Sequence, residues 1–274
     1  MVSRVIPVDP FDLVLFGATG DLARRKILPS LFHRFQIAQF SPQSRIIGTS
    51  RSKLDKSGFQ AFVAEAIREF GQEGETGEED IAAFEAAAQA VPPPDNAVVF
   101  VGSSSIRFWK TLADDMSPLP VVQRGFGGAH MSHVLYNFDR IITPYQPRAV
   151  VVFVGENDLH AGKSVERLIA EYHTFIDKIE SQLPAVDVWI LSMKPSKSRW
   201  KLWGEMQKVD DAFQAFAAAS HKIHYVDSGK VLLNAGGRPD DVYVFDGLHL
   251  NDEGYRRWTK ILKPLLLDTY HWLE

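Results

Sequence analysis

The stretch VVFVGSSSIRFW, residues 98–109, joins four apolar residues to a Gly-Ser-Ser-Ser turn and then to an amphipathic segment. This order predicts a buried strand, a sharp turn and the start of a helix. A serine in such a turn is held at the end of a strand, where its hydroxyl can meet a substrate. A nucleophilic serine also needs a base and an anion-stabilising pocket, which the rest of the chain would have to supply.

Strand and helix patterns alternate from Asn96 onward. The strand candidates are short continuous apolar runs such as AVVVFV, which is typical of strands buried on both faces by helices. We therefore predict an α/β fold with a parallel five-stranded sheet. The expected strands are 97–101, 120–124, 149–154, 186–192 and 223–227, and the expected helices span roughly 130–142, 163–182, 203–219 and 252–268.

Chemically useful residues follow several of these strands, and the site of an open parallel sheet lies beyond the carboxyl ends of its strands. Consecutive glycines let backbone amides face an anion, and an asparagine amide can donate to the same oxyanion. A histidine near a serine can take its proton, and a carboxylate on the other ring nitrogen fixes the tautomer. The blocks are GSSS at 102–105, RGFGGAH at 124–130, GEND at 155–158 and DGLHL at 246–250.

These four blocks, in this order, resemble the SGNH hydrolases, also called the GDSL lipase/acylhydrolase superfamily, over about residues 79–268. The resemblance implies a three-layer, flavodoxin-like sheet and an esterase that uses no metal or other cofactor. It implies a nucleophile, a base and an orienting acid at Ser104, His249 and Asp246. It also implies an oxyanion hole built from the backbone amides of Ser104 and Gly128 and the side chain of Asn157.

Three positions depart from the family pattern. Ser103 stands where the family name has aspartate, Gln123 stands where asparagine is common, and Ala129 follows Gly128 where many members have aspartate. GSSSI-type first blocks resemble a known subgroup. The departures leave the implied catalytic set intact and concern the contacts around it.

Each implied residue has a simpler alternative. Ser103 and Ser105 compete with Ser104 as nucleophile, and the glycines of the second block could only permit a turn. Asn157 could be a helix N-cap or an Asx-turn residue. His130 and His133 lie close to the predicted site and compete with His249 as the base.

The first seventy residues show a separate strand–helix–strand–helix pattern. DLVLF at 12–16 and RIIGTS at 45–50 read as strands, GATGDLA follows the first strand, and 59–70 has helical spacing. Such a unit opens a nucleotide-binding fold, in which backbone amides and a helix N-terminus can meet a phosphate. We therefore predict a small partial Rossmann appendage.

The segment DLVLFGATGDLARRKILPSLF, residues 12–32, resembles the N-terminus of glucose-6-phosphate dehydrogenases, and the resemblance covers about residues 4–68. It implies a dinucleotide-binding turn at Gly17, Thr19, Gly20, Asp21 and Leu22, and Arg51 as the partner of a 2′-phosphate. The family's RIDHYLGKE segment and the remaining strands of its sheet have no counterpart, so dehydrogenase chemistry is not expected. The alternatives are a relic of gene fusion, an NADP-binding module, or a dimerisation module that pairs its open sheet edges.

Composition narrows the remaining possibilities. The 274 residues carry a net charge of −4 and no cysteine, which excludes disulfides, thiolate zinc sites and cysteine nucleophiles. No apolar run is long enough to span a bilayer, and no signal-peptide pattern opens the chain. GQEGETGEED at 71–80 breaks the pattern, so we expect an N-terminal region at 1–70, a linker at 71–78 and a hydrolase domain at 79–274.

Together these patterns predict a cytoplasmic serine esterase for short-chain carboxylic esters, because no long apolar lid segment is present. A carbohydrate acetyl esterase or a lysophospholipase-type acylhydrolase is the alternative within the same class. The expected partner is a small-molecule ester, with neither nucleic acid nor membrane, and the N-terminal region could form a homo-oligomer.

Overall fold

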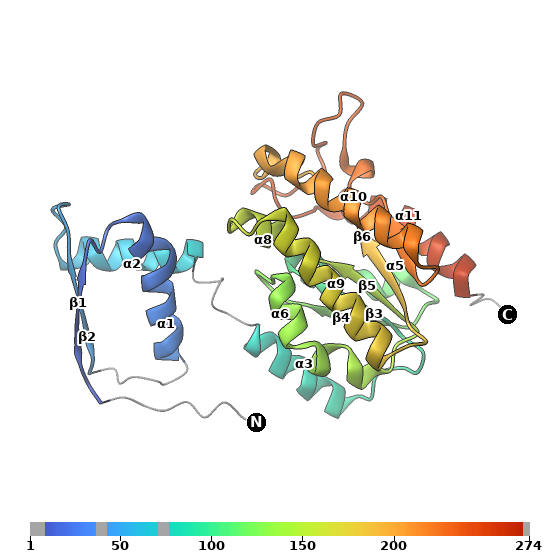
Figure 1. Cartoon of the computed structure of the whole chain (residues 1–274), viewed down its shortest axis with the longest axis horizontal. Helices are drawn as coiled ribbons and strands as arrows, with labels where there is room; N and C mark the ends of the chain where they lie inside the picture. Colours follow the sequence, from blue (N-terminus) through green and yellow to red (C-terminus); the bar gives the residue numbers. More distant parts are fainter. Residues whose placement is uncertain (1–8, 37–42, 71–76, 271–274) are drawn as a thin grey trace. The chain divides into compact units, whose positions relative to one another are not determined.

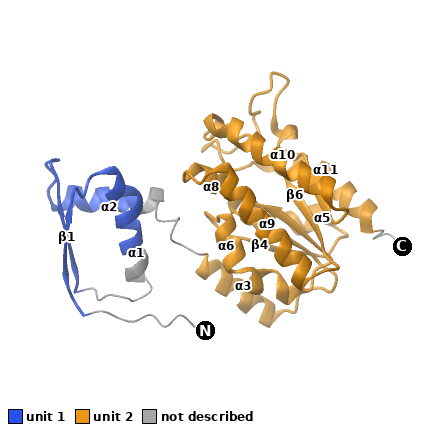
Figure 2. Ribbon diagram, in the orientation of Figure 1, with its two compact units in different colours: residues 1–76 blue, residues 77–274 orange. Residues whose placement is uncertain are grey.

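The computed structural model describes residues 9–36, 43–70 and 77–270 (Figure 1). The chain divides into two compact units, residues 1–76 and 77–274 (Figure 2). The linker predicted at 71–78 falls largely on residues 71–76, which lie outside the described residues, as do residues 4–8 of the dehydrogenase-like segment. The first helix of the second unit begins at Glu78.

The second unit is built on a five-stranded parallel sheet with the order β4-β3-β5-β6-β7. All five predicted strands are present, and each of their ends lies within one residue of the predicted end. The order places the strand that carries the Gly-Ser-Ser-Ser turn between two others. The strands are β3 (Val98–Gly102), β4 (Val121–Gly125), β5 (Ala149–Phe153), β6 (Asp187–Leu191) and β7 (Ile223–Val226).

Helices cover both faces of this sheet, which gives the predicted three layers (Figure 1). Alternate residues of β3 enter different cores, because successive strand side chains point to opposite faces. Val99 and Val101 pack with α3, α6, α9 and α10, whereas Val98 and Phe100 pack with α5 and α11. These helices are α3 (Glu78–Ala90), α5 (Leu112–Met116), α6 (Met131–Tyr136), α9 (Val165–Gln182), α10 (Trp203–Ala219) and α11 (Asp252–Tyr270).

The helix predicted over 130–142 is two helices, and that prediction was wrong in this detail. Asn137 separates them, since it is the C-cap of α6 and the N-cap of α7 (Phe138–Ile141). Asn137 is buried, and its side-chain amide donates to the carbonyl of His133 at 3.1 Å. The backbone N–H of Asn137 donates to the same carbonyl at 3.1 Å, so this residue ends α6 with both its backbone and its side chain.

The short helices α4 (Ser104–Arg107) and α8 (Glu156–His160) had no predictable length, because a single turn carries no periodicity. α4 begins within the GSSS block that follows β3, and α8 begins within the GEND block that follows β5. They hold the residues after β3 and β5 in a helical turn, at the carboxyl edge of the sheet.

The first unit has the predicted strand–helix–strand–helix order. Its two strands, β1 (Asp12–Phe16) and β2 (Arg45–Thr49), pair in parallel. A wide helical turn at Ala23–Ile27 leads into α1 (Leu28–Gln36), and α2 (Lys56–Phe70) follows β2. The core is small, and it consists of Leu15, Ala18, Ala23, Leu28 and Ala66.

Candidate active site

The Gly-Ser-Ser-Ser turn is fixed by the glycine at the end of β3. Gly102 has a φ of +149°, and a Cβ atom there would lie 2.0 Å from the carbonyl oxygen of Phe153. Only glycine fits this close approach of two neighbouring strands. Ser103 and Ser105 are buried, at 4% and 1% exposure, whereas Ser104 is partly exposed at the start of α4. Of the three candidate serines, Ser104 is therefore the one that is not buried.

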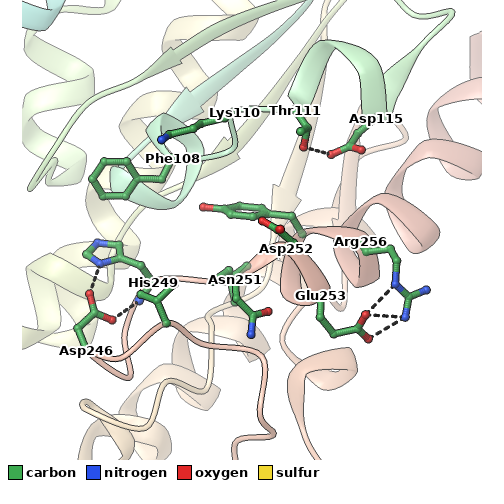
Figure 3. Close-up of a pocket in the computed structure, with 13 residues that line it drawn as sticks. Phe108, Lys110, Thr111, Asp115, Asp246, His249, Asn251, Asp252, Glu253 and Arg256 are labelled. Atoms are coloured by element: carbon green, nitrogen blue, oxygen red, sulfur yellow. Dashed lines mark hydrogen bonds and ion pairs between the residues drawn. The ribbon is translucent and has the colours of Figure 1, made fainter.

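His249 and Asp246 complete a hydrogen-bonded chain with Ser104. The Nε2 atom of His249 lies 2.9 Å from the Ser104 hydroxyl, and its Nδ1 atom lies 2.6 Å from Oδ2 of Asp246. The second carboxylate oxygen of Asp246 accepts the backbone N–H groups of Leu248 and His249 at 2.8 and 3.0 Å. Figure 3 shows Asp246 facing both the ring and the backbone of His249.

These contacts determine which atoms of Asp246 and His249 carry a proton. Partial burial raises the pKa of Asp246, but the hydrogen bonds from the His249 ring and from the two backbone N–H groups outweigh it, so the pKa lies below its ordinary value. The carboxylate is therefore ionised at neutral pH and accepts a hydrogen bond from Nδ1–H. The Nε2 atom is then the basic nitrogen, and it faces the Ser104 hydroxyl.

The competing histidines have other contacts. His130 and His133 stack at the start of α6, with ring centroids 5.0 Å apart, and the backbone N–H of His130 donates to Nδ1 of His133. Burial, together with the nearby His130, lowers the pKa of His133 to about 4. His249 is the histidine that lies against the hydroxyl of Ser104.

The residues predicted for an oxyanion hole come from strands adjacent to β3. Gly102 pairs with Gly125 of β4 and with Phe153 of β5, so the three strands end at the same level. Gly128 has a φ of +66°, which favours glycine. Asn157 is not the N-cap of α8, because Gly155 holds that position, and its side chain donates to the carbonyl of Ala129 at 3.0 Å. That Gly128 and Asn157 bind one oxyanion stays a prediction.

Two carboxylates brace the loop after β4. Asp158 is completely buried, accepts the backbone N–H of Met131 at 3.2 Å, and pairs with Lys163. Asp80, in the first turn of α3, pairs with Arg107 at 3.1 Å and accepts the N–H of Gly127 at 3.4 Å. The loop that carries Gly128 is thus tied on one side to α8 and on the other to α3.

A cleft of about 1120 Å³ borders His249 and Asp246 (Figure 3). Phe108 forms part of its wall, is 42% exposed, and places its ring edge-on against the His249 ring at 5.0 Å. Trp109, Phe126 and Met131 also follow the predicted strand ends, but all three are buried in the core. The other lining residues are Lys110, Thr111, Asp115, Val244, Leu250, Asn251, Asp252, Glu253, Tyr255 and Arg256.

The predicted dinucleotide residues of the first unit are only partly gathered. Gly17, Thr19, Gly20 and Arg51 line one hollow, together with Thr49, Ser50 and Ser52. Asp21 instead pairs with Arg25 at 2.6 Å, and Leu22 is largely exposed. Neither of those two residues lines the hollow.

Within residues 9–36, 43–70 and 77–270, no three His, Cys, Asp or Glu side chains gather in a way that could hold a metal ion. None of the helices described in those ranges has the length and apolar character that a membrane span requires.

Comparison with known proteins divides the chain in two. The model of the GDSL-like Lipase/Acylhydrolase family matches residues 101–257, and the model of the glucose-6-phosphate dehydrogenase NAD binding domain matches residues 14–97. The latter match extends past the end predicted near residue 68 and includes α3, which packs in the second unit.

Individual proteins follow the same division. A GDSL-like lipase from Bacteroides thetaiotaomicron is 20% identical, with a TM-score of 0.59 over 69% of this chain and 98% of its own. A catalytic mutant of an acetylxylan esterase from Geobacillus stearothermophilus is 12% identical, with a TM-score of 0.51 over 64% of this chain and 94% of its own.

A curated relative, glucose-6-phosphate 1-dehydrogenase from Rhizobium meliloti, is 46% identical over 84 residues, which are 31% of this chain and 17% of the relative. This chain therefore covers about a sixth of that enzyme's length.

Proposed function

The chain belongs to the GDSL-like lipase/acylhydrolase family, and from this premise we propose that it is a serine esterase for short-chain carboxylic esters. One observation carries the proposal, namely the hydrogen-bonded chain from the Ser104 hydroxyl through His249 to Asp246. This arrangement has the geometry that a nucleophile, a general base and an orienting acid require.

In the proposed acylation step, the Ser104 oxygen attacks the ester carbonyl while Nε2 of His249 takes the hydroxyl proton. The carboxylate of Asp246 stabilises the imidazolium that forms and does not itself take the proton. His249 then gives the proton to the leaving alcohol, and the acyl group remains on Ser104. In the second step, water attacks this acyl-enzyme with His249 again as the base, and the acid is released.

The tetrahedral oxyanion of each step needs donors that are already in place. We assign this role to the backbone amides of Ser104 and Gly128 and to the side chain of Asn157. The assignment is supported by the common level at which β3, β4 and β5 end and by the bond from Asn157 to Ala129, which holds two of the three loops together.

Acetyl esters are the substrates that we favour. Ten of the thirteen residues that line the cleft beside His249 are polar or charged, so a hydroxylated alcohol would find hydrogen-bond partners there. Two solved structures with a similar fold are described as an acetylxylan esterase and an acetyl esterase. A carbohydrate acetyl ester would thus place its sugar near Phe108, and a lysophospholipid is the less suitable alternative.

The test is hydrolysis of p-nitrophenyl acetate by the purified chain and by Ser104→Ala. We expect the wild type to turn over and the variant to fall to the background rate, while its melting temperature stays the same. Equal rates for the two proteins would exclude Ser104 as the nucleophile.

A second candidate function concerns the first unit. The hollow lined by Gly17, Thr19, Gly20 and Arg51 offers hydroxyls and a guanidinium, which are donors that a nucleotide phosphate takes. We expect NADP to raise the melting temperature of the first unit and Arg51→Ala to abolish that shift. Absence of any shift at millimolar NADP would count against phosphate binding.

A further inference from the structure

A buried lysine lies behind the candidate active site. Lys194 follows β6 by three residues, has 0% of its surface exposed, and places Nζ 3.0 Å from Oε2 of Glu156, which is itself only 4% exposed. A buried charge is costly unless it is paired and hydrogen-bonded. The other oxygen of Glu156, Oε1, has no hydrogen-bond partner among the described residues, so Lys194 makes the direct ion pair with Glu156, and the guanidinium of Arg199 is a second cation that interacts with it electrostatically.

Each residue of this ion pair is next to a segment that carries candidate site residues. Glu156 directly precedes Asn157 in the first turn of α8. The Nζ atom of Lys194 also donates to the carbonyl oxygen of Leu248 at 2.7 Å. Leu248 lies between Asp246 and His249, and its N–H is already bound to Asp246. One residue of the base loop is therefore held at its N–H from one side and at its carbonyl from the other.

The backbone around Lys194 is held as firmly as its side chain. The N–H of Met193 donates to Oδ1 of Asp210 at 2.8 Å, and the carbonyl of Pro195 accepts the hydroxyl of Tyr243 at 2.9 Å. Both contacts are buried. Lys194 is thus held in position, because a shift of its backbone or of its ammonium group would break hydrogen bonds that the surrounding residues make.

We propose that Lys194 and Glu156 are a positioning pair that fixes the loop of Asp246 and His249 relative to the helix of Asn157. This inference rests on the proposed esterase function, since it concerns how two parts of that site keep their separation. In the proposed mechanism, His249 must stay within hydrogen-bond distance of Ser104 while Asn157 keeps its position as oxyanion donor. The pair joins the two supporting segments directly, through one salt bridge and one hydrogen bond.

The alternative is that the pair only contributes to stability, and two variants separate these roles. Lys194→Met leaves Glu156 buried without a partner, so both stability and turnover should fall. The double variant Lys194→Met/Glu156→Met removes both charges, and apolar replacement of a buried pair often restores stability. It cannot restore the bond to Leu248. We therefore expect the double variant to regain its melting temperature while kcat stays about 10²-fold low with KM unchanged.

The experiment measures kcat, KM and melting temperature with p-nitrophenyl acetate for wild type, both variants, Ser104→Ala and Lys197→Met. Lys197 is the matched control, because it lies in the same segment but is exposed and pairs with the exposed Asp241. Recovery of kcat together with stability in the double variant would overturn the positioning pair and leave the esterase proposal intact. A wild-type rate equal to that of Ser104→Ala would overturn both.

Discussion

Two glycine-rich turns in this chain each follow a strand, one after β1 and one after β3, and their surroundings differ. β3 is buried at every residue and has a paired strand on each side, whereas β1 pairs with β2 and leaves Phe16 81% exposed. The hollow at the first turn is lined by residues of two segments, namely Gly17, Thr19 and Gly20 and residues 49–52. At the second turn, the Ser104 hydroxyl lies 2.9 Å from Nε2 of His249, and the carbonyl of Gly102 accepts the N–H of Phe126, which follows β4.

This difference indicates what a strand–turn–helix segment needs in order to become a reactive site. The turn exposes a hydroxyl or a set of amides in either unit. A base, an acid and an oxyanion donor have to come from neighbouring strand ends, and only a sheet of several strands brings those ends to one edge. We therefore place the chemistry in the second unit, and four predictions test that contrast.

The largest effect should follow removal of the base. We expect His249→Ala to lower kcat for p-nitrophenyl acetate by about 10⁴–10⁶-fold, because the Ser104 hydroxyl then has no group to take its proton. Arg51→Ala, which alters the turn of the first unit, should leave kcat unchanged. His221→Ala is the control for loss of an imidazole, since His221 is exposed. A large loss in Arg51→Ala would remove the contrast between the two turns.

Removal of one oxyanion donor should have the next largest effect. We expect Asn157→Ala to lower kcat by about 10²–10³-fold with little change in KM, because the donor acts mainly in the transition state. Asn234→Ala, in a loop of the same unit, is the matched control. An unchanged kcat in Asn157→Ala would mean that the strand ends meet without forming an oxyanion hole.

The stability of the second unit should also depend on pH. The pKa of His133 is lowered to about 4, mainly by burial, from an ordinary value of 6.5. Above pH 6.5 the ring is neutral in both folded and unfolded states and contributes nothing. Below pH 6.5 the unfolded state binds a proton that the folded state refuses, so stability falls as the pH drops from 6.5 toward 4, by up to about 3 kcal/mol.

Denaturant melts at pH 7.5 and pH 5 measure this dependence. His133→Asn keeps an acceptor near the backbone N–H of His130 and cannot be protonated, so it should lose less stability over that interval than the wild type. The difference should appear in the unfolding of the second unit, where His133 lies. Equal losses in the two proteins would show that the ring titrates normally in the folded state.

The smallest effect should follow removal of the first unit. A chain that starts at Gly77 keeps α3, so Asp80 still braces the loop of Gly127, and we expect kcat within about twofold of the full chain. A chain that starts at Ala97 loses Ile81, which is completely buried, and should be less stable by about 2–5 kcal/mol. Equal stability of the two shortened chains would mean that the second unit does not need α3. That result would agree with the match of α3 to the dehydrogenase domain.

Much of the fold could be predicted from the sequence. The strands of the second unit are continuous apolar runs between turn residues, and their positions follow from that pattern alone. The apolar runs alone do not give the order of the sheet, because strand neighbours are set by contacts between distant segments, and it was the resemblance to a flavodoxin-like family that implied it. The break at Asn137 was missed for a local reason, since its side-chain hydrogen bond leaves no trace in the hydrophobic periodicity.

The candidate site divides in a similar way. Ser104, Asp246, His249 and Asn157 each sit in a short block with a recognisable composition, and the structure places three of them in one hydrogen-bonded chain. Lys194 was not singled out, although it follows a strand end as the others do. Its role depends on Glu156 and Leu248, which lie 38 and 54 residues away, and no spacing rule connects such positions.

The central claim is that the hydroxyl of Ser104 is the nucleophile of this chain, and covalent labelling tests it most directly. A fluorophosphonate should add one equivalent to the full chain, and peptide mass spectrometry should place the adduct on the segment that contains Ser104. Ser104→Ala should take up no label under the same conditions. An adduct on any other residue, or full esterase activity after Ser104 is removed, would contradict the account.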